Sequence, residues 1–176
     1  MLLANKQSFT SLFLLLMFGL FSCKSHTPLA TVQQVDLEKY AGRWYEISTI
    51  PISPQKGCSC TYAEYTVTKK GYVKVYNHCI KKGKESDITG KAFVKDTATN
   101  AQLSVQFFWP FRGAYWIIGL DENYQWAIVG SPSRKNLWIL SRTPQMDSTL
   151  YQSLLQKARD KGFDTNLLVN TLQNCN

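Results

Sequence analysis

Alternating apolar and polar residues run through most of the chain and predict a series of short β-strands. A few turn-forming residues separate each strand from the next, and no segment with helical periodicity interrupts the series. The predicted strands are residues 43–49, 61–67, 72–78, 88–96, 101–108, 113–121, 125–131 and 137–143. Eight consecutive strands joined by short links favour an up-and-down antiparallel meander over a Greek-key sandwich.

The first hairpin indicates which side of this sheet is apolar. "TKKG" at 68–71 separates two strands and offers Gly71 for a turn position with positive φ. Pairing 63 with 77, 65 with 75 and 67 with 73 places the apolar faces of both strands on one side. Closing eight strands buries that side and removes the exposed edges. We therefore predict an all-β fold, an eight-stranded up-and-down antiparallel barrel that can hold one small ligand.

One α-helix is predicted after the last strand. Asp147 or Ser148 suits the N-cap, and Gly162 suits the C-terminal stop. Apolar residues recur every four positions between these limits, at Leu150, Leu154 and Ala158. We expect this apolar stripe to pack against the outside of the barrel.

The N-terminus is interpreted as a lipoprotein signal peptide spanning residues 1–22. Lys6 precedes the apolar run 9–21, which is too short for a comfortable transmembrane helix. "LFSC" at 20–23 resembles a bacterial lipobox, in which cleavage precedes the cysteine and Cys23 becomes acylated. Residues 23–35 are then the acylated N-terminus and a polar tether, and residues 36–176 form the folded domain. An ordinary signal peptide that is cut nearby is the alternative.

The chain of 176 residues is basic, with a formal charge of +8. Its lysines are scattered singly or in short pairs such as Lys69 and Lys70, and no dense basic helix is present. We therefore expect no nucleic-acid partner. Attraction to an anionic membrane surface is the more natural use of this charge.

The cysteine count fits an exported protein. If Cys23 carries lipid, four cysteines remain, an even number that suits two disulfides: Cys58, Cys60, Cys79 and Cys175. The spacing of two between the first pair is not usual for zinc, and the chain has only two histidines. We expect no metal site and no cofactor.

Three short motifs carry a resemblance to the lipocalin family. They are Gly42-x-Trp44 on the first strand, "LDENY" at 120–124, and Arg142 at the end of the last strand. "KYAGRWYEI", "CTYAEY" and "LWILSRTP" resemble more closely the apolipoprotein D-like and bacterial outer-membrane lipoprotein subgroup, over residues 36–175. The signature positions are Gly42, Trp44, Asp121, Tyr124 and Arg142. We expect Arg142 to lie across the Trp44 ring at the closed end of the barrel.

The resemblance implies a calyx that binds a fatty acid or a lysophospholipid. It places four aromatic residues in the pocket: Tyr40, Tyr65, Tyr115 and Trp138. The strand alternation agrees for Tyr65 and adds the wall residues Val75, Asn77, Val105 and Phe107. Glu46 is a candidate inward-facing carboxylate that contacts a head group or hydrogen bonds within the base. For each apolar wall residue, simple filling of the barrel is the alternative role.

The same resemblance implies a disulfide between strand 61–67 and the C-terminal tail, Cys60–Cys175, which leaves Cys58–Cys79. The alternative pairing, Cys60–Cys79 with Cys58–Cys175, stays open.

Three functions are candidates for this sequence: a lipid-binding module, a lipocalin-fold enzyme and a structural envelope lipoprotein. "VGSPS" does not match a G-x-S-x-G nucleophile motif, and His78 and Cys79 are strand neighbours that point to opposite faces. We therefore predict no enzyme, but a protein anchored by lipid in the cell envelope, in the outer membrane of a Gram-negative bacterium. Whether two chains form a homodimer stays open. The apolar segment 107–116 is interpreted either as a lid over the barrel or as a loop that dips into the bilayer.

Overall fold

The computed structural model describes residues 27–175 of the chain. The predicted signal peptide, residues 1–22, and the predicted acylation site Cys23 lie outside the described residues. Within residues 27–175, no helix has the length and apolar character needed to cross a membrane.

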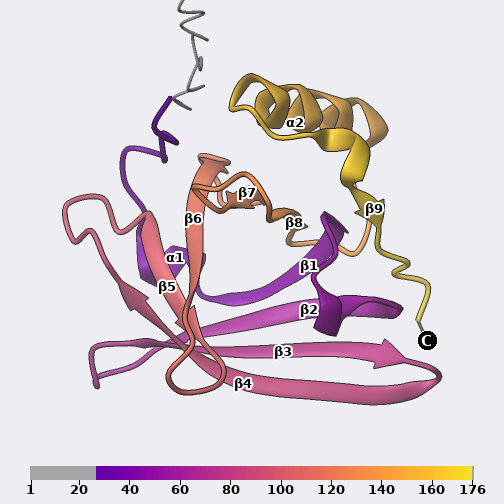
Figure 1. The fold of residues 1–176 in the computed structure, drawn as a ribbon, viewed down its shortest axis with the longest axis horizontal. Helices are drawn as coiled ribbons and strands as arrows, with labels where there is room; N and C mark the ends of the chain where they lie inside the picture. The colour runs from indigo at the N-terminus through magenta and orange to yellow at the C-terminus, as the bar shows by residue number, and fades with distance from the viewer. Residues whose placement is uncertain (1–26, 176) are drawn as a thin grey trace, which may run out of the picture.

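Eight antiparallel strands form a closed barrel (Figure 1). They are β1 Gly42–Thr49, β2 Cys58–Val67, β3 Val73–Lys81, β4 Lys84–Val94, β5 Gln102–Gln106, β6 Gly113–Leu120, β7 Trp126–Gly130 and β8 Leu137–Ser141. Each strand pairs with the next along the chain, and β1 pairs with both β8 and β2, which closes the barrel. The predicted up-and-down barrel is confirmed.

The register of the first hairpin is the predicted one. Residues 63, 65 and 67 lie opposite 77, 75 and 73, and Gly71 has φ +77 in the turn. The strand ends differ from the prediction, because β2 begins at residue 58 and β4 at residue 84. The segment 84–87 is polar and shows no alternation of apolar and polar residues, so the sequence did not predict it as a strand. Its extended conformation comes from backbone pairing with β3.

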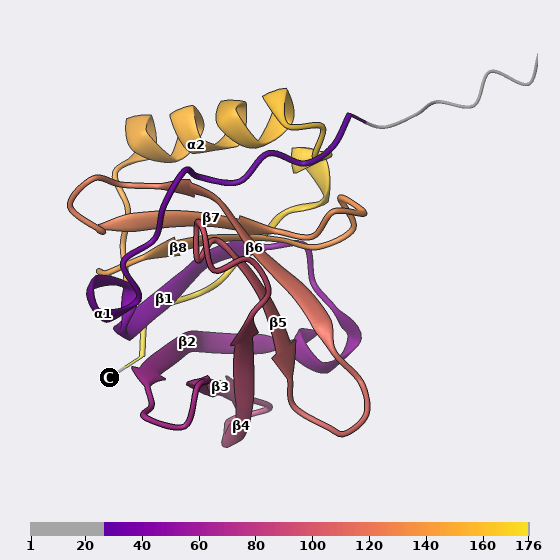
Figure 2. The same ribbon diagram turned by 90° about the vertical axis from the view of Figure 1, so that its left-hand side faces the viewer.

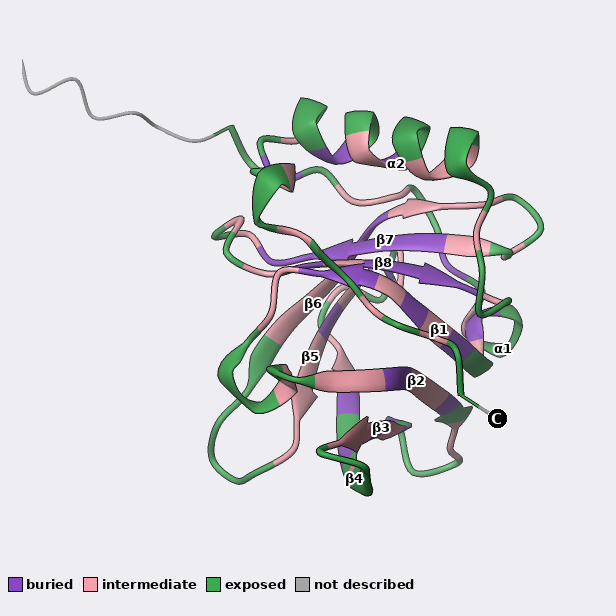
Figure 3. Ribbon diagram, turned by 90° about the vertical axis from the view of Figure 1, so that its right-hand side faces the viewer, coloured by how far each residue is buried: buried purple, intermediate pink, exposed green. Residues whose placement is uncertain are grey.

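One helix of several turns covers the outside of the barrel. Helix α2, Ser148–Asp160, has Asp147 as its N-cap, and the Asp147 carboxylate accepts a hydrogen bond from the amide of Leu150. Leu154 and Ala158 are buried against the outer faces of β7 and β8, with Ile128 and Ile139 among their neighbours. Figure 3 shows these buried strands beneath the helix, whose far side is exposed. The predicted outer helix is confirmed.

The C-terminal tail completes the wall where β1 and β2 separate. β2 pairs with β1 only over Gly42–Tyr45, and a short ninth strand, β9 Val169–Asn170, pairs with the end of β1. The amide of Cys60 on β2 donates to the carbonyl of Leu172, 2.7 Å away. The tail therefore bridges the two strands.

The segment expected to be a tether packs on the barrel over its described part, residues 27–35. Leu29 and Val35 are buried, and the amide of Val32 donates to the carbonyl of Ile117 on β6. A short helix, α1 Leu37–Tyr40, follows. The expected tether boundary at residue 35 is therefore wrong for residues 27–35. The polar composition of this segment hid its two apolar residues, which fill sites that only the folded barrel creates.

Arg142 joins three separate segments at the end of the barrel that carries α1. Its guanidinium carbon lies 3.9 Å from the centroid of the Trp44 ring, the expected cation–π contact. Its nitrogens donate to the carbonyls of Lys39, Arg43 and Tyr124, at 2.7, 2.8 and 3.1 Å. Trp44 itself is fully buried and donates to the carbonyl of Tyr40.

Three other signature residues shape the same end. Gly42 has φ +90, and a Cβ there would lie 3.4 Å from the Arg142 guanidinium, so a side chain would be strained and would crowd this contact. The Asp121 carboxylate accepts from two amides of the β6–β7 connection, and the Tyr124 hydroxyl accepts from the amide of Asp36. The signature positions therefore close one end of the barrel, which we call the closed end; the opposite end is the open end.

The structure pairs Cys58 with Cys79 and Cys60 with Cys175, the pairing that the family resemblance implies. The first disulfide joins β2 to β3, across 21 residues of chain. The second ties the tail to β2, across 115 residues.

Trp44→Ala is expected to lower the free energy of unfolding by about 3–5 kcal/mol, because it empties a fully buried site and removes the surface on which Arg142 lies. Urea unfolding measures the loss. Trp109→Ala is the matched control, because Trp109 is 86% exposed and should change stability by less than about 0.5 kcal/mol. A Trp44→Ala protein with the wild-type unfolding midpoint would contradict the role given to Trp44.

Removing the disulfide of the tail, by Cys60→Ser with Cys175→Ser, is expected to cost more stability than removing the other pair. Loop-entropy estimates give about 5 kcal/mol for a closed loop of 115 residues and about 3 kcal/mol for 21 residues. Urea unfolding of the two double variants provides the comparison. Equal losses would show that loop closure does not dominate their effect.

Candidate ligand-binding site

Three tyrosine hydroxyls meet inside the barrel, and the ring of one of them, Tyr40, lies 4.9 Å from the Trp44 ring. Tyr40 comes from α1, Tyr65 from β2 and Tyr115 from β6, and the hydroxyl of Tyr115 lies 2.8 Å from each of the other two. Burial raises the pKa of all three phenols, that of Tyr65 to about 12. The group therefore stays neutral at physiological pH and forms a hydrogen-bonded floor.

Apolar and aromatic side chains continue the interior wall above this floor. The Trp138 ring stacks against Tyr115 with centroids 6.5 Å apart, and Val75 is buried on β3. Val105 and Phe107 pack against the same interior cluster. Tyr115, Trp138, Val105 and Phe107 are only partly buried although they face inward, so space accessible to solvent remains beside them.

Two positions show how the wall is shaped. The Phe107 ring lies over Gly90, where an added Cβ would come within 2.7 Å of the ring, so the site accepts only glycine without rearrangement. Asn77, a polar wall residue on β3, lies opposite Ala63 and is partly buried. The structure thus brings all the predicted pocket residues onto the interior face.

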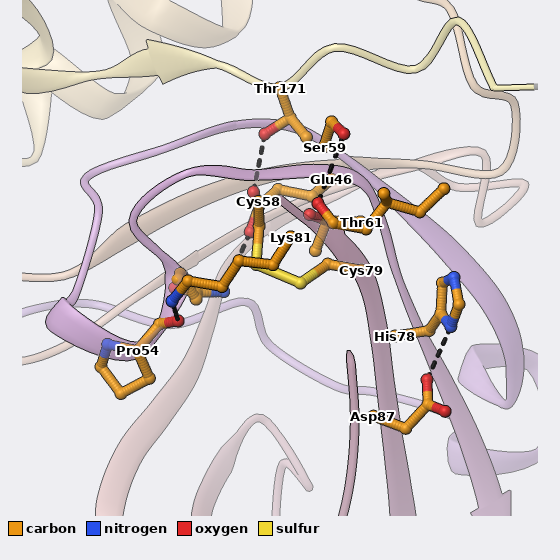
Figure 4. The surroundings of a disulfide bond; sticks show 12 residues. Glu46, Pro54, Cys58, Ser59, Thr61, His78, Cys79, Lys81, Asp87 and Thr171 are labelled. Atoms are coloured by element: carbon orange, nitrogen blue, oxygen red, sulfur yellow. Dashed lines mark hydrogen bonds and ion pairs between the residues drawn. A yellow bond between two sulfur atoms is a disulfide. The ribbon is translucent and has the colours of Figure 1, made fainter. Parts of the chain in front are cut away.

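Glu46 is a buried carboxylate in this wall, 5% exposed. One carboxylate oxygen accepts from the hydroxyl of Thr171 in the tail at 2.6 Å (Figure 4). The other accepts from the side-chain amide of Gln55 at 3.2 Å. Desolvation raises the pKa of Glu46, which outweighs the opposite effect of its two hydrogen bonds. The sequence suggested an inward Glu46 but missed both partners, because they lie 9 and 125 residues away.

Other buried polar atoms in this region have no hydrogen-bond partner among the described residues. They are the side-chain oxygens of Gln55, on the β1–β2 connection, and of Thr61, on β2. Such atoms are costly when left unpaired, so this part of the wall suits a ligand with polar groups or bound water.

The neighbours His78 and Cys79 do not form a catalytic pair. His78 stacks on the Tyr62 ring, and its Nδ1 atom lies 2.6 Å from Asp87, on the outer face of β3 and β4 (Figure 4). Cys79, its neighbour, is held in a disulfide. Within residues 27–175, no group of three or more His, Cys, Asp or Glu side chains is arranged to hold a metal ion.

The geometry is that of a barrel closed at one end, with an apolar interior wall and a floor of hydroxyls. The sequence also matches the family model for a lipocalin-like domain over residues 35–173. The chain belongs to the lipocalin family. Eight-stranded barrels of this family are wide enough to hold one small ligand.

The relatives of this lipocalin come from plants, bacteria and animals. It is 38% identical to Temperature-induced lipocalin-1 of Arabidopsis thaliana over 155 residues, 82% of this chain and 83% of the relative. It is 35% identical to the Outer membrane lipoprotein Blc of Escherichia coli strain K12 over 157 residues, 86% and 89% of the two chains. Apolipoprotein D of Bos taurus is 37% identical over 139 residues, 73% and 70% of the two chains. The predicted subgroup is confirmed.

Solved lipocalin structures share the fold at lower identity. Insecticyanin from the tobacco hornworm Manduca sexta matches with a TM-score of 0.67 and 20% identity, covering 82% of this chain and 84% of the other. This similarity supports a shared barrel fold and says nothing about which ligand the barrel binds.

Glu46→Gln is expected to change how stability depends on pH. The folded-state pKa of Glu46 lies above its ordinary value of 4.5, so the buried carboxyl costs nothing below pH 4.5 and destabilises the fold as pH rises through the folded-state pKa. Glutamine stays neutral, so the stability of the variant relative to wild type should increase between pH 4 and pH 7. Urea unfolding across this range tests the trend, and a difference that does not change with pH would contradict it.

Proposed function

We propose that this lipocalin binds, stores or transports amphipathic lipids, such as fatty acids and lysophospholipids, while anchored to a membrane of the bacterial cell envelope. The observation that carries the proposal is the interior face, where partly exposed aromatic and aliphatic side chains line the barrel together with the three tyrosine hydroxyls. An acyl chain buried there contributes roughly 0.8 kcal/mol for each CH₂ group.

The chemistry of the wall favours amphiphiles over purely apolar ligands. Gln55 and Thr61 offer side-chain oxygens that have no hydrogen-bond partner within residues 27–175, and Glu46 adds a carboxylate. A head group with hydroxyl or amide donors could pair with these atoms, whereas a hydrocarbon would leave them unsatisfied. The proposal therefore predicts selectivity for ligands that combine one long chain with a polar head.

The proposed location rests on the N-terminal sequence and on relatives. "LFSC" places a cysteine directly after a short apolar segment, and relatives in Escherichia coli and Vibrio cholerae are named as outer membrane lipoproteins. We propose Cys23 as the acylated residue and the outer membrane as the site. Cys23→Ser removes the thiol that accepts the lipid, so it should abolish labelling by radioactive palmitate and remove the protein from the outer membrane.

A binding role is favoured over catalysis. Among residues 27–175, the interior offers tyrosines of raised pKa and one buried carboxylate, but no nucleophile with an adjacent base. Turnover of a lipid ester by the pure protein would overturn this part of the proposal.

The proposal predicts that affinity grows with acyl-chain length. Calorimetry with lysophosphatidylcholines of 14 and 16 carbons, below their critical micelle concentrations, should give about 15-fold tighter binding for the longer chain. Trp138→Ala should lower the affinity for both ligands by at least tenfold, since it removes part of the wall. Tyr76→Ala, an aromatic change on the outer face of β3, is the matched control and should leave affinity unchanged. Binding that ignores Trp138, or no binding of any long-chain amphiphile, would refute the proposed site.

A further inference from the structure

The two ends of the barrel differ in charge. In an up-and-down barrel the connections alternate between the ends, so the β1–β2, β3–β4, β5–β6 and β7–β8 connections lie at the open end. These four connections contain no Asp or Glu, and their basic residues are Lys56, Lys82, Arg112, Arg134 and Lys135. The closed end, with α1 and the other connections, carries the acidic residues Asp36, Glu38, Asp96, Asp121 and Glu122. The connections of the open end therefore carry basic residues without acidic ones, whereas α1 and the connections of the closed end carry both signs of charge.

The open end also exposes large apolar side chains. Phe108, Trp109 and Phe111 on the β5–β6 connection are 68%, 86% and 77% exposed, and Ile52 on the β1–β2 connection is 38% exposed. The interpretation of this segment as a lid is wrong, because these three aromatic rings point into solvent and only Phe107 packs into the barrel. Exposed aromatic residues clustered on one loop indicate an interaction site.

The surface beside Trp109 is basic as well. A shallow pocket of about 360 Å³ lies there, and its charged lining residues are Lys74 and Lys91. The Lys91 ammonium is 5.0 Å from the centroid of the Tyr72 ring. No acidic side chain lines this pocket, so it suits an anionic group such as a phosphate.

The described chain begins at this same end. The Arg134 guanidinium, on the β7–β8 connection, donates to the carbonyl of Thr27. Figures 2 and 3 both show the first described residues on the same side of the barrel as the β5–β6 connection, with α1 on the opposite side. Four chain steps separate Thr27 from Cys23, a reach of at most about 14 Å. An acyl group on Cys23 would therefore hold the open end close to the membrane.

We propose that the open end of the barrel docks directly on an anionic phospholipid bilayer. Phe108, Trp109 and Phe111 lie in the interface between head groups and acyl chains, and the basic connections around them contact the lipid phosphates. The mouth then opens onto the bilayer, and an amphiphile passes between bilayer and barrel without crossing water. The role of the anchor here rests on the proposed function, whereas the docking of the loops does not.

The test uses the chain from residue 23 to 176 with Cys23→Ser, so that no acyl group contributes, and with both disulfides formed. Binding to vesicles of phosphatidylcholine with 30% phosphatidylglycerol is measured by co-sedimentation, with pure phosphatidylcholine as the comparison. We expect clearly stronger binding to the anionic vesicles. Trp109→Ser should weaken it by at least tenfold, and Trp109→Phe, which keeps an aromatic ring at the interface, should retain most of it. Wild-type affinity in Trp109→Ser would overturn the proposal.

A pair of charge variants separates local docking from net charge. Lys56→Gln with Lys135→Gln removes two open-end charges and should weaken anionic-vesicle binding by about 25-fold, at about fivefold for each charge. Lys69→Gln with Lys70→Gln removes two charges at the closed end, gives the same net charge, and should leave binding unchanged. Equal losses in both pairs would overturn the proposal, because binding would then follow the charge of the whole molecule.

Two further measurements distinguish other outcomes. A dimer in lipid-free solution that Trp109→Ser dissociates, seen by sedimentation, would overturn the proposal, because a second copy would then cover the loop. Monomeric lysophosphatidylcholine should bind all these variants like the wild type. If the variants bind lysophosphatidylcholine normally but do not show the expected differences in vesicle binding, the docking surface alone is refuted. If they show the expected vesicle binding but no variant and no wild-type protein binds lysophosphatidylcholine, the proposed function alone is refuted.

Discussion

Closure of the barrel at β1 is the constraint on which the rest of the structure depends. This strand pairs with β8 along one edge, but its other edge is shared between β2 and the C-terminal tail. At the closed end, Arg142 covers Trp44 and binds carbonyls from three segments. Towards the open end, β9 and the Cys60–Cys175 disulfide hold the tail in the gap. Without these contacts, strand edges and the apolar interior would be open to water.

This closure also creates the site. The tail delivers Thr171 to Glu46, and α1 delivers Tyr40 to the hydroxyl floor. Both contacts come from segments outside the eight-strand meander, so the polar features of the interior depend on how α1 and the C-terminal tail pack on the barrel. The interior thus combines an apolar wall with a few polar atoms, which is the composition that an amphiphilic ligand requires.

The fold and the wall could be predicted far better than the polar contacts. The alternation of apolar and polar residues predicted the register of residues 63–67 against 73–77, and the turn sequence predicted the positive φ of Gly71. Both predictions succeeded because they depend only on residues that are neighbours along the chain. Residues 27–35 were expected to be a tether, since Leu29 and Val35 stand alone in a polar segment and only the folded barrel offers them buried sites. Gln55 gave no signal at all, since nothing in its neighbourhood along the chain indicates that its amide reaches Glu46.

The sequence by itself determined the number and order of the strands, the outer helix and the signature residues that close the barrel. These follow from periodicity over a few residues, from capping and from short motifs that act locally. Only the tertiary structure decided that the tail completes the wall, that Glu46 is buried between Gln55 and Thr171, and that the aromatic rings of residues 108–111 face solvent beside basic connections. Those features depend on pairings between distant segments, and their free energy arises from burial and charge in the closed barrel, which no local pattern encodes.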